Sequence, residues 1–379
     1  MKSSNPQGRM VLFAASMVSM ALGSIHAFSV FLEPLEALFE TSRAMVSLIY
    51  SFSLVFLTIA VLFGPAVYSR LHPATIYILV AFLGAAGAGL ASIADGLGLV
   101  WVGYSLTFGI ANGLGYGFGL QFAARAYPEH SGLAMGVVTA AYALGAVLAP
   151  YGFETALAFG GFSSAMVALG SIVFVVSSGA ALMVALSGAR YFDAQTKACV
   201  SNLPRDRIVV IWIAYGSGVA AGLMAIGHAA GITANAGLPG WTAVVAIAAC
   251  NLAGSLFSGW LSDRFSHRRI LTILPLLGAV ALLTLSVLPA QTLVFLGIVG
   301  FAYGGTIATY PAAIFYLYPG EAGPRAYGRI FTAWGCAGLL APWFAGQIYD
   351  WNASYTPALW IAACLSILSA YTAQKYIRR

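Results

Sequence analysis

The sequence has very few charged residues for its length. Only 7% of its 379 residues are Asp, Glu, Lys or Arg, and 60% are hydrophobic, whereas an average soluble domain has about 25% charged residues. So few charges cannot cover the surface of a soluble fold of this size. Apolar runs of about 20 residues, enough to cross a bilayer, recur along the whole chain. The composition therefore indicates a membrane protein.

Cysteines are also scarce, and their spacing excludes several kinds of site. None of the four is part of a Cys-x-x-Cys motif; Cys250, Cys336 and Cys364 lie in apolar runs and Cys199 in a polar stretch. We interpret them as free structural thiols. The run "GLGYGFG" (113–119) lacks the preceding strand of a phosphate-binding loop, so its glycines are expected to serve helix packing. No metal or cofactor is predicted, and no ATP-binding motif suggests a primary pump.

Carboxylates are missing from the middle of the apolar runs. Six of the acidic residues fall near outer ends or loops of the expected topology, and the others on its cytoplasmic side: the six are Glu33, Glu36, Glu40, Asp95, Glu154 and Asp350. The carboxylate proton relay of drug/proton antiporters therefore has no candidate. A membrane-embedded enzyme would need convergent carboxylates, a metal cluster or an activated nucleophile, and none is found. Besides tyrosines, His26 and His228 are the only titratable groups well inside the runs.

The apolar runs predict an all-α membrane protein with twelve transmembrane helices in two six-helix bundles. The expected spans are 10–34, 44–67, 74–94, 97–124, 132–157, 162–187, 207–234, 241–262, 269–289, 292–318, 326–349 and 355–375. The first run exceeds the apolar region of a signal peptide, so we interpret it as a retained helix.

The basic residues give the expected topology. With the N-terminus inside, sixteen of the seventeen Lys and Arg fall in inner segments, and only Arg43 falls outside. This bias predicts that both termini and the 188–207 loop are cytoplasmic in a multi-pass protein of the bacterial inner-membrane type. The net charge of +6 is thus a topology signal and not a nucleic-acid footprint.

The two halves of the chain resemble each other. "GIANG" (109–113) matches "GFAYG" (300–304) at an offset of 191, and "MGVVTAAYALGAVLAP" (135–150) matches "YGRIFTAWGCAGLLAP" (327–342) at 192. We predict a bundle at 1–187, a cytoplasmic linker at 188–206 and a second bundle at 207–379. Such parallel repeats are typical of secondary transporters with a midplane site. The linker is too short to form the soluble domain of a receptor.

The stretch "GWLSDRFSHRR" (259–269) resembles the signature of the major facilitator superfamily. The resemblance implies a conformational latch on the cytoplasmic side, formed by Asp263 with Arg264, Arg268 or neighbouring backbone. In the first half the corresponding stretch is "GPAVYSRLHP", where Tyr68 replaces the aspartate.

A narrower resemblance covers most of the chain. "HAFSVFLEPLEALFETSRAMVSLIYSFSLVF" (26–56), "AARAYPEHSGLAMGVVTAAYALGAVLAP" (123–150) and "YGGTIATYPA" (303–312) are similar to the oxalate/formate antiporter and monocarboxylate transporter families. The resemblance places His26 where monocarboxylate carriers have a lysine that takes part in proton and substrate binding.

The same resemblance shows where the expected charges are missing. Ser255 occupies the position of the substrate-binding arginine, Trp334 that of the second antiporter cation, and Asn251 that of a carboxylate in the monocarboxylate carriers. Two substrate charges would then lack a permanent countercharge, which argues against a dicarboxylate such as oxalate.

The remaining polar groups define the predicted site. Imidazole, with an unperturbed pKa of about 6.5, suits proton coupling, so His26 and His228 are the proton-coupling candidates; each could instead be a neutral packing residue bonded across helices. Polar side chains in membrane helices usually face the bundle interior. The predicted substrate-binding residues are His26, Tyr50, Asn112, Tyr116, Tyr142, His228, Asn251, Ser255, Tyr303, Tyr310 and Trp334.

These observations favour a secondary transporter of a small organic monoanion, coupled to protons. The alternative is an exporter of a neutral or amphipathic compound, which fits Ser255 and Trp334 better. The expected partners are a small-molecule substrate, protons and the lipid bilayer, without nucleic acid, and we expect a monomer that is not an enzyme.

Overall fold

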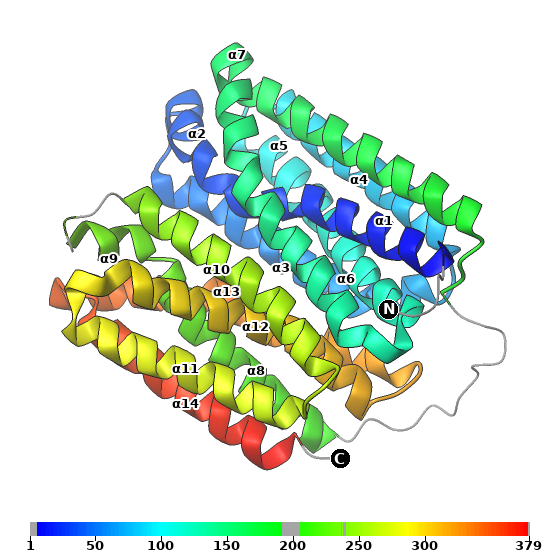
Figure 1. Cartoon of the computed structure of the whole chain (residues 1–379). Coiled ribbons are helices and arrows are strands. Elements are labelled where there is room, and N and C mark those ends of the chain that lie inside the picture. Colours follow the sequence, from blue (N-terminus) through cyan, green and yellow to red (C-terminus); the bar gives the residue numbers. More distant parts are fainter. Residues whose placement is uncertain (1–5, 192–204, 236, 238–239, 378–379) are drawn as a thin grey trace. The chain divides into compact units, whose positions relative to one another are not determined.

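The chain is almost entirely helical in the computed structural model, which describes residues 6–191, 205–235, 237 and 240–377 (Figure 1). No strand occurs in these ranges. The elements are α1 (Pro6–Gly23), η1 (Ser24–Phe31), α2 (Leu32–Phe39), α3 (Arg43–Tyr68), α4 (Pro73–Ser92), α5 (Leu97–Val100), η2 (Trp101–Phe108), α6 (Gly109–Ala126), η3 (Pro128–His130), α7 (Ser131–Ser187), α8 (Arg205–Ile226), α9 (Ala229–Asn235), α10 (Gly240–Ser262), α11 (His267–Val287), η4 (Pro289–Gln291), α12 (Thr292–Leu317), α13 (Ala322–Asn352) and α14 (Thr356–Tyr376).

The described helices agree with twelve membrane crossings. Ten segments are long and apolar enough to cross a bilayer, and one of them, Pro128–Ser187, is 60 residues long. This segment is two helices joined by a sharp bend at Gly160 and Gly161, where Gly161 has φ +66. Figure 1 shows the two limbs of α7 meeting at this bend. The twelfth helix, α13, has 31 residues but is less apolar than the ten.

The chain forms two compact units. The first contains residues 1–128 and 141–197, and the second contains residues 129–140 and 198–379. The start of α7 is therefore grouped with the second unit, although it belongs to the first half of the sequence. The predicted linker, 188–206, lies largely outside the described residues, and the predicted division of the chain stays a prediction.

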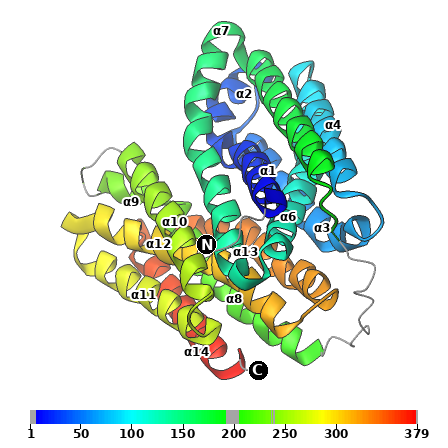
Figure 2. The same ribbon diagram turned by 45° about the vertical axis from the view of Figure 1, so that its right-hand side comes forward.

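Glycines allow close helix packing in the first unit. A Cβ on Gly109 or Gly113 of α6 would overlap the backbone carbonyls of Ser53 or Leu57 in α3. The second limb of α7 lies beside α4 (Figure 2), where Phe82 and Phe174 meet edge to face at 5.4 Å. The predicted role of the glycine-rich run in helix packing is confirmed, since small residues let backbones approach closely.

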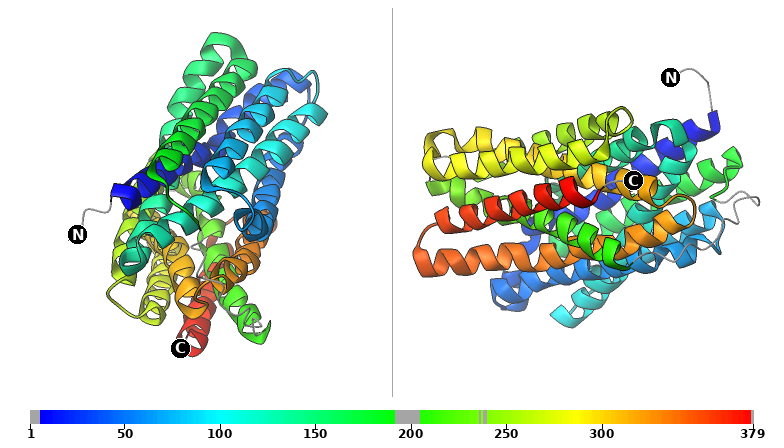
Figure 3. Two further views of the ribbon diagram at one scale, coloured as in Figure 1. Left: turned by 90° about the vertical axis from the view of Figure 1, so that its right-hand side faces the viewer. Right: turned by 90° about the horizontal axis from the view of Figure 1, so that it is seen from below.

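The second unit repeats this packing. Gly300 and Gly304 of α12, which match Gly109 and Gly113 in the sequence repeat, lie against the backbone carbonyls of Ile247 and Asn251 in α10. On the other side of the unit, α14 packs against α11 and α8 (Figure 3). The repeat in the sequence is therefore also a repeat of helix contacts.

Three of the predicted spans are not continuous α-helices, and one of them, 97–124, contains the π-helix η2. The first changes to a 3-10 helix at Ser24–Phe31, and His26 lies in this stretch. The span predicted at 207–234 is broken, because α8 ends at Ile226 and α9 begins at Ala229. His228 therefore lies in a turn between two helices.

Candidate functional site

Four of the predicted residues of the first unit form one chain of interactions around His26. The His26 Nδ1 atom is hydrogen bonded to the Tyr50 hydroxyl at 2.7 Å, and the imidazole meets the Tyr142 ring edge to face at 5.5 Å. The Tyr142 hydroxyl donates to Asn112 Oδ1 at 2.8 Å, and Asn112 Nδ2 donates to the Leu22 carbonyl at 2.6 Å. This His26 network connects α3, α6 and α7 to the end of α1.

An aromatic shell surrounds the His26 network. Tyr116, also a predicted site residue, packs against Tyr142 with ring centroids 4.8 Å apart, and Phe28 is stacked with Tyr50 at 6.0 Å. Asn112 and Tyr116 are buried, whereas His26, Tyr50 and Tyr142 are half-buried. These three side chains are therefore not sealed within the core of the unit.

Close backbone packing holds α1 against the first limb of α7. A Cβ on Gly23 would overlap the Tyr142 carbonyl oxygen, and one on Gly145 would overlap the Met20 carbonyl oxygen. Because only glycine fits at these two points, the backbone beside His26 and the backbone of Tyr142 have a fixed spacing. The ring contact between the two side chains follows from this spacing.

The second unit has an equivalent interaction at the matching positions. Trp334 Nε1 donates to the Tyr303 hydroxyl at 3.0 Å, and the indole stacks on Phe331 at 5.2 Å. In the repeat, Trp334 matches Tyr142 and Tyr303 matches Asn112. Each unit therefore has an aromatic donor bonded to the matching residue of the repeat, but the histidine network belongs to the first unit.

Asn251 and Ser255 lie where α10 meets α12. Ser255 is fully buried, and its hydroxyl donates to the Gly304 carbonyl at 3.1 Å. A Cβ on Gly304 would overlap the backbone and side-chain oxygens of Asn251. The structure thus gives Ser255 a role in packing two helices.

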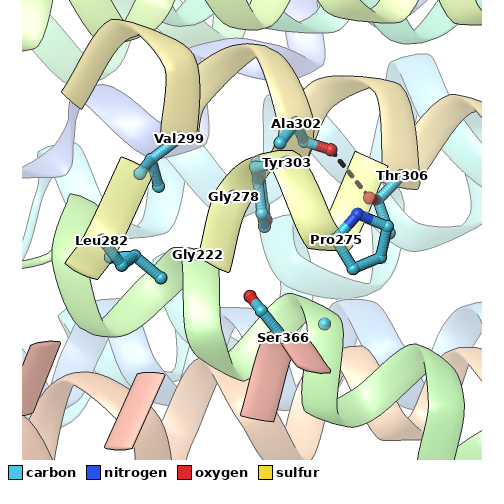
Figure 4. A pocket seen from close by; sticks show the side chains of 10 residues that line it. Gly222, Pro275, Gly278, Leu282, Val299, Ala302, Tyr303, Thr306 and Ser366 are labelled. Atoms are coloured by element: carbon cyan, nitrogen blue, oxygen red, sulfur yellow. Dashed lines mark hydrogen bonds between the residues drawn. The ribbon is translucent and has the colours of Figure 1, made fainter. Parts of the chain in front are cut away.

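A small cavity lies beside Tyr303 in the second unit (Figure 4). It is lined by residues of α8, α11, α12 and α14, including Tyr303, Thr306 and Ser366. Its volume is about 10 Å³, which accommodates about one water molecule. This cavity alone is too small for an organic anion.

Two predicted residues of the second unit lie apart from Tyr303 and Trp334. Tyr310 is fully buried and packs on Tyr215 at 4.6 Å. His228 Nε2 is hydrogen bonded to the Pro342 carbonyl at 2.8 Å, and the ring packs on Tyr355 at 5.3 Å. These contacts agree with the packing interpretation of His228.

The candidate latch is built from Asp263 and the first turn of α7, within the second unit. The Oδ1 atom of Asp263 accepts from the Gly132 amide at 2.7 Å, and the Oδ2 atom accepts from the Leu133 amide at 2.9 Å. Gly132 also lies against the backbone of Gly259, so the two segments approach closely. A carboxylate at this position satisfies unpaired amides and opposes the positive end of the helix dipole.

The arginines considered as latch partners have other contacts. The Arg264 guanidinium lies over the Trp260 ring, 3.9 Å from its centroid. Arg268 Nε donates to Gln374 Oε1 at 3.2 Å. The sequence left Arg264, Arg268 or backbone groups open as partners of Asp263. In the structure its hydrogen-bond partners are backbone amides.

The comparisons with known proteins agree with this architecture. Residues 207–379 match the family model described as "Major Facilitator Superfamily". The chain is 25% identical over 345 residues to YhjX, an uncharacterized MFS-type transporter of Escherichia coli (strain K12), and the match covers 87% of this chain and 85% of that protein.

Solved structures show the same fold. The proton:xylose symporter XylE, bound to 6-bromo-6-deoxy-D-glucose, matches with a TM-score of 0.73 and 13% identity, over 99% of this chain and 97% of that one. A variant of the E. coli fucose:proton symporter FucP matches with a TM-score of 0.72 and 15% identity, over 98% of each chain. The predicted fold class is therefore confirmed. Residues 207–379 thus match the major facilitator superfamily model, and the whole chain has the fold of solved transporters of that superfamily.

Proposed function

We propose that the protein transports a small organic monoanion together with a proton, and that His26 binds both. The observation that supports this most directly is the 2.7 Å bond between His26 and Tyr50, in a half-buried network of neutral side chains. Two of the structurally similar proteins are named as proton symporters, which is consistent with proton coupling in this fold.

A proton on His26 changes the bond to Tyr50. Both nitrogens of a charged imidazole are donors, so Nδ1 then donates to the Tyr50 oxygen and the phenolic proton turns away. That hydroxyl becomes a donor for a carboxylate beside the charged ring. A buried cation without a partner is costly, so proton and anion each favour the binding of the other.

The composition of the network favours one negative charge in the substrate. Together with Tyr116 of the aromatic shell, its side chains are an imidazole, three phenols and an amide: His26, Tyr50, Tyr116, Tyr142 and Asn112. One protonated histidine balances one carboxylate, and the complex of protein, proton and anion is then electroneutral. We infer from this balance that the substrate is a monocarboxylate and that transport is symport. The distribution of Lys and Arg supports an inner membrane as the proposed location.

A second candidate function is transport of a neutral or amphipathic compound. The Tyr303 and Trp334 pair favours it, because these side chains present aromatic surface and hydrogen-bonding groups without charge. In that case His26 is a packing residue, and transport is insensitive to its substitution.

The test is transport by purified protein in liposomes. We expect uptake of a small monocarboxylate by the wild type to increase as external pH falls from about 7.5 to about 5.5. His26→Gln and His26→Ala should lose most of the uptake and its pH dependence. His228→Gln is the matched control, and it should retain both. Wild-type rates and pH dependence in the two His26 variants would contradict the proposal.

A further inference from the structure

The transmembrane segment that ends with α6 contains an unusual helical stretch. Residues Trp101–Phe108 form the π-helix η2, and the Thr107 hydroxyl donates to the carbonyl of Val102, five residues earlier, at 2.8 Å. π-helical turns are rare and occur frequently at functional sites. A role for η2 therefore has to be sought in its contacts.

Close packing fixes η2 against α4. A Cβ on Gly103 would lie 2.5 Å from the Gly87 carbonyl oxygen, and a Cβ on Gly87 would lie 2.7 Å from the Gly103 carbonyl oxygen. Each glycine therefore meets the backbone of the other helix. Such backbone-to-backbone contact leaves η2 little freedom to shift along or rotate about its axis. The next two residues of η2 are placed by this contact.

These two residues bind the backbone directly beside His26 and Tyr50. The Ser105 hydroxyl donates at 2.7 Å to the carbonyl of Ile49, the residue before Tyr50. The Tyr104 hydroxyl donates at 3.5 Å to the carbonyl of Ile25, the residue before His26. Both side chains are fully buried, so water does not compete for these bonds.

Ring contacts add to the hydrogen bonds that connect η2 to the segments of His26 and Tyr50. The Tyr104 ring packs on Phe28 at 5.0 Å, and Phe28 is in turn stacked with Tyr50 at 6.0 Å. Phe28 lies in the same 3-10 stretch as His26. The longer bond from Tyr104 is thus supported by aromatic packing on the segment that holds the imidazole.

We propose that Ser105 and Tyr104 are positioning residues that set the distance between His26 and Tyr50. Ser105 binds the backbone of α3, and Tyr104 binds the backbone of η1. The distance between Ser105 and Tyr104 is fixed because they are adjacent in a tightly packed helix. Their relevance to transport rests on the proposed function of His26. The titratable side chains around His26 are Tyr50 of α3, Tyr104 of η2, Tyr142 of α7 and, behind Tyr142, Tyr116 of α6.

The experiment combines nitrogen NMR of ¹⁵N-histidine-labelled protein with transport. The His26 signal is assigned by its loss in His26→Gln. Ser105→Ala and Tyr104→Phe should shift the His26 Nδ1 signal and slow proton-coupled uptake about fivefold, the effect of one typical hydrogen bond. Thr107→Val is the control: it removes a hydroxyl-to-carbonyl bond of the same π-helix that does not reach His26 or Tyr50, and both readouts should match the wild type.

Ser105→Cys keeps the side-chain size with a weaker donor, and should give an intermediate Nδ1 shift even if the alanine variant folds poorly. An unchanged His26 signal in Ser105→Cys and Tyr104→Phe overturns the positioning role. A second outcome separates the two proposals. If the His26 signal is shifted in the Ser105 and Tyr104 variants but His26→Gln transports like the wild type, the positioning role is supported and the proposed function is overturned.

Discussion

Replacement of Asp263 by asparagine should weaken the contact between α7 and the end of α10. The carboxylate accepts from two successive amides, Gly132 at 2.7 Å and Leu133 at 2.9 Å. Asparagine has almost the same shape but only one acceptor oxygen and no net charge. Asp263→Asn therefore removes one hydrogen bond and the attraction between the charge and the helix dipole.

The size of the effect follows from these contacts. A charge at a half-buried helix terminus contributes up to about 2 kcal/mol, and a hydrogen bond to a charged group about 1.5–3 kcal/mol. The remaining asparagine oxygen and entering water recover part of this. We expect the contact between residue 263 and the two amides to lose about 1.5 kcal/mol of stability. This is about a tenfold change in the equilibrium between the form with this contact and the form without it.

Hydrogen exchange measures this equilibrium at the amides themselves. In Asp263→Asn, exchange at Gly132 and Leu133 should be about tenfold faster than in the wild type. Because the contact is predicted to act as a latch, transport should fall while substrate binding is retained.

Glu321 provides a matched control. It is the N-cap residue of α13, but its side chain caps no backbone amide of that helix, and its ion pair with Arg325 is at the surface. Glu321→Gln should leave exchange and transport close to wild type. If Asp263→Asn exchanges at Gly132 and Leu133 as slowly as the wild type, the capping interpretation is refuted.

The other predictions concern topology and packing. Cysteine labelling from outside the cell should reach Arg43→Cys and miss Arg190→Cys, and the reverse pattern would overturn the predicted topology. Gly145→Ala places a methyl group on the Met20 carbonyl and should lower the free energy of unfolding by about 1–3 kcal/mol or more. Gly152→Ala meets no atom within 4 Å, so thermal unfolding of the two variants should differ clearly; equal stability would show that the two helices can separate at no cost.

The number and order of the membrane helices could be predicted from the sequence because the bilayer imposes them. Each crossing needs a long apolar run, and the repeat around Gly109 and Gly300 indicated which helices are equivalent. The breaks at η1 and η2 could not be predicted, because they depend on close contacts with other helices. Hydropathy is the same for a 3-10, an α- and a π-helix.

The candidate site was predictable in part for a similar reason. Asn112 and Tyr142 were correctly expected in the bundle interior, since polar groups avoid lipid, but their direct bond needed coordinates. Matching positions alone suggested that His228 resembles His26, and the break after Ile226 gives it a different environment. Ser105 was missed because a serine in a membrane helix gives no sign of which carbonyl it binds.

The 3-10 stretch of the first helix also affects the length of that helix. A 3-10 helix rises about 2.0 Å per residue and an α-helix about 1.5 Å. The eight residues Ser24–Phe31 are therefore about 4 Å longer than they would be as an α-helix. Rewinding them would draw α2 toward α1 by that distance and rotate Phe28 relative to His26, with no bend in either flanking helix. The length of the first span therefore depends on the helix type at the residue proposed to bind the proton.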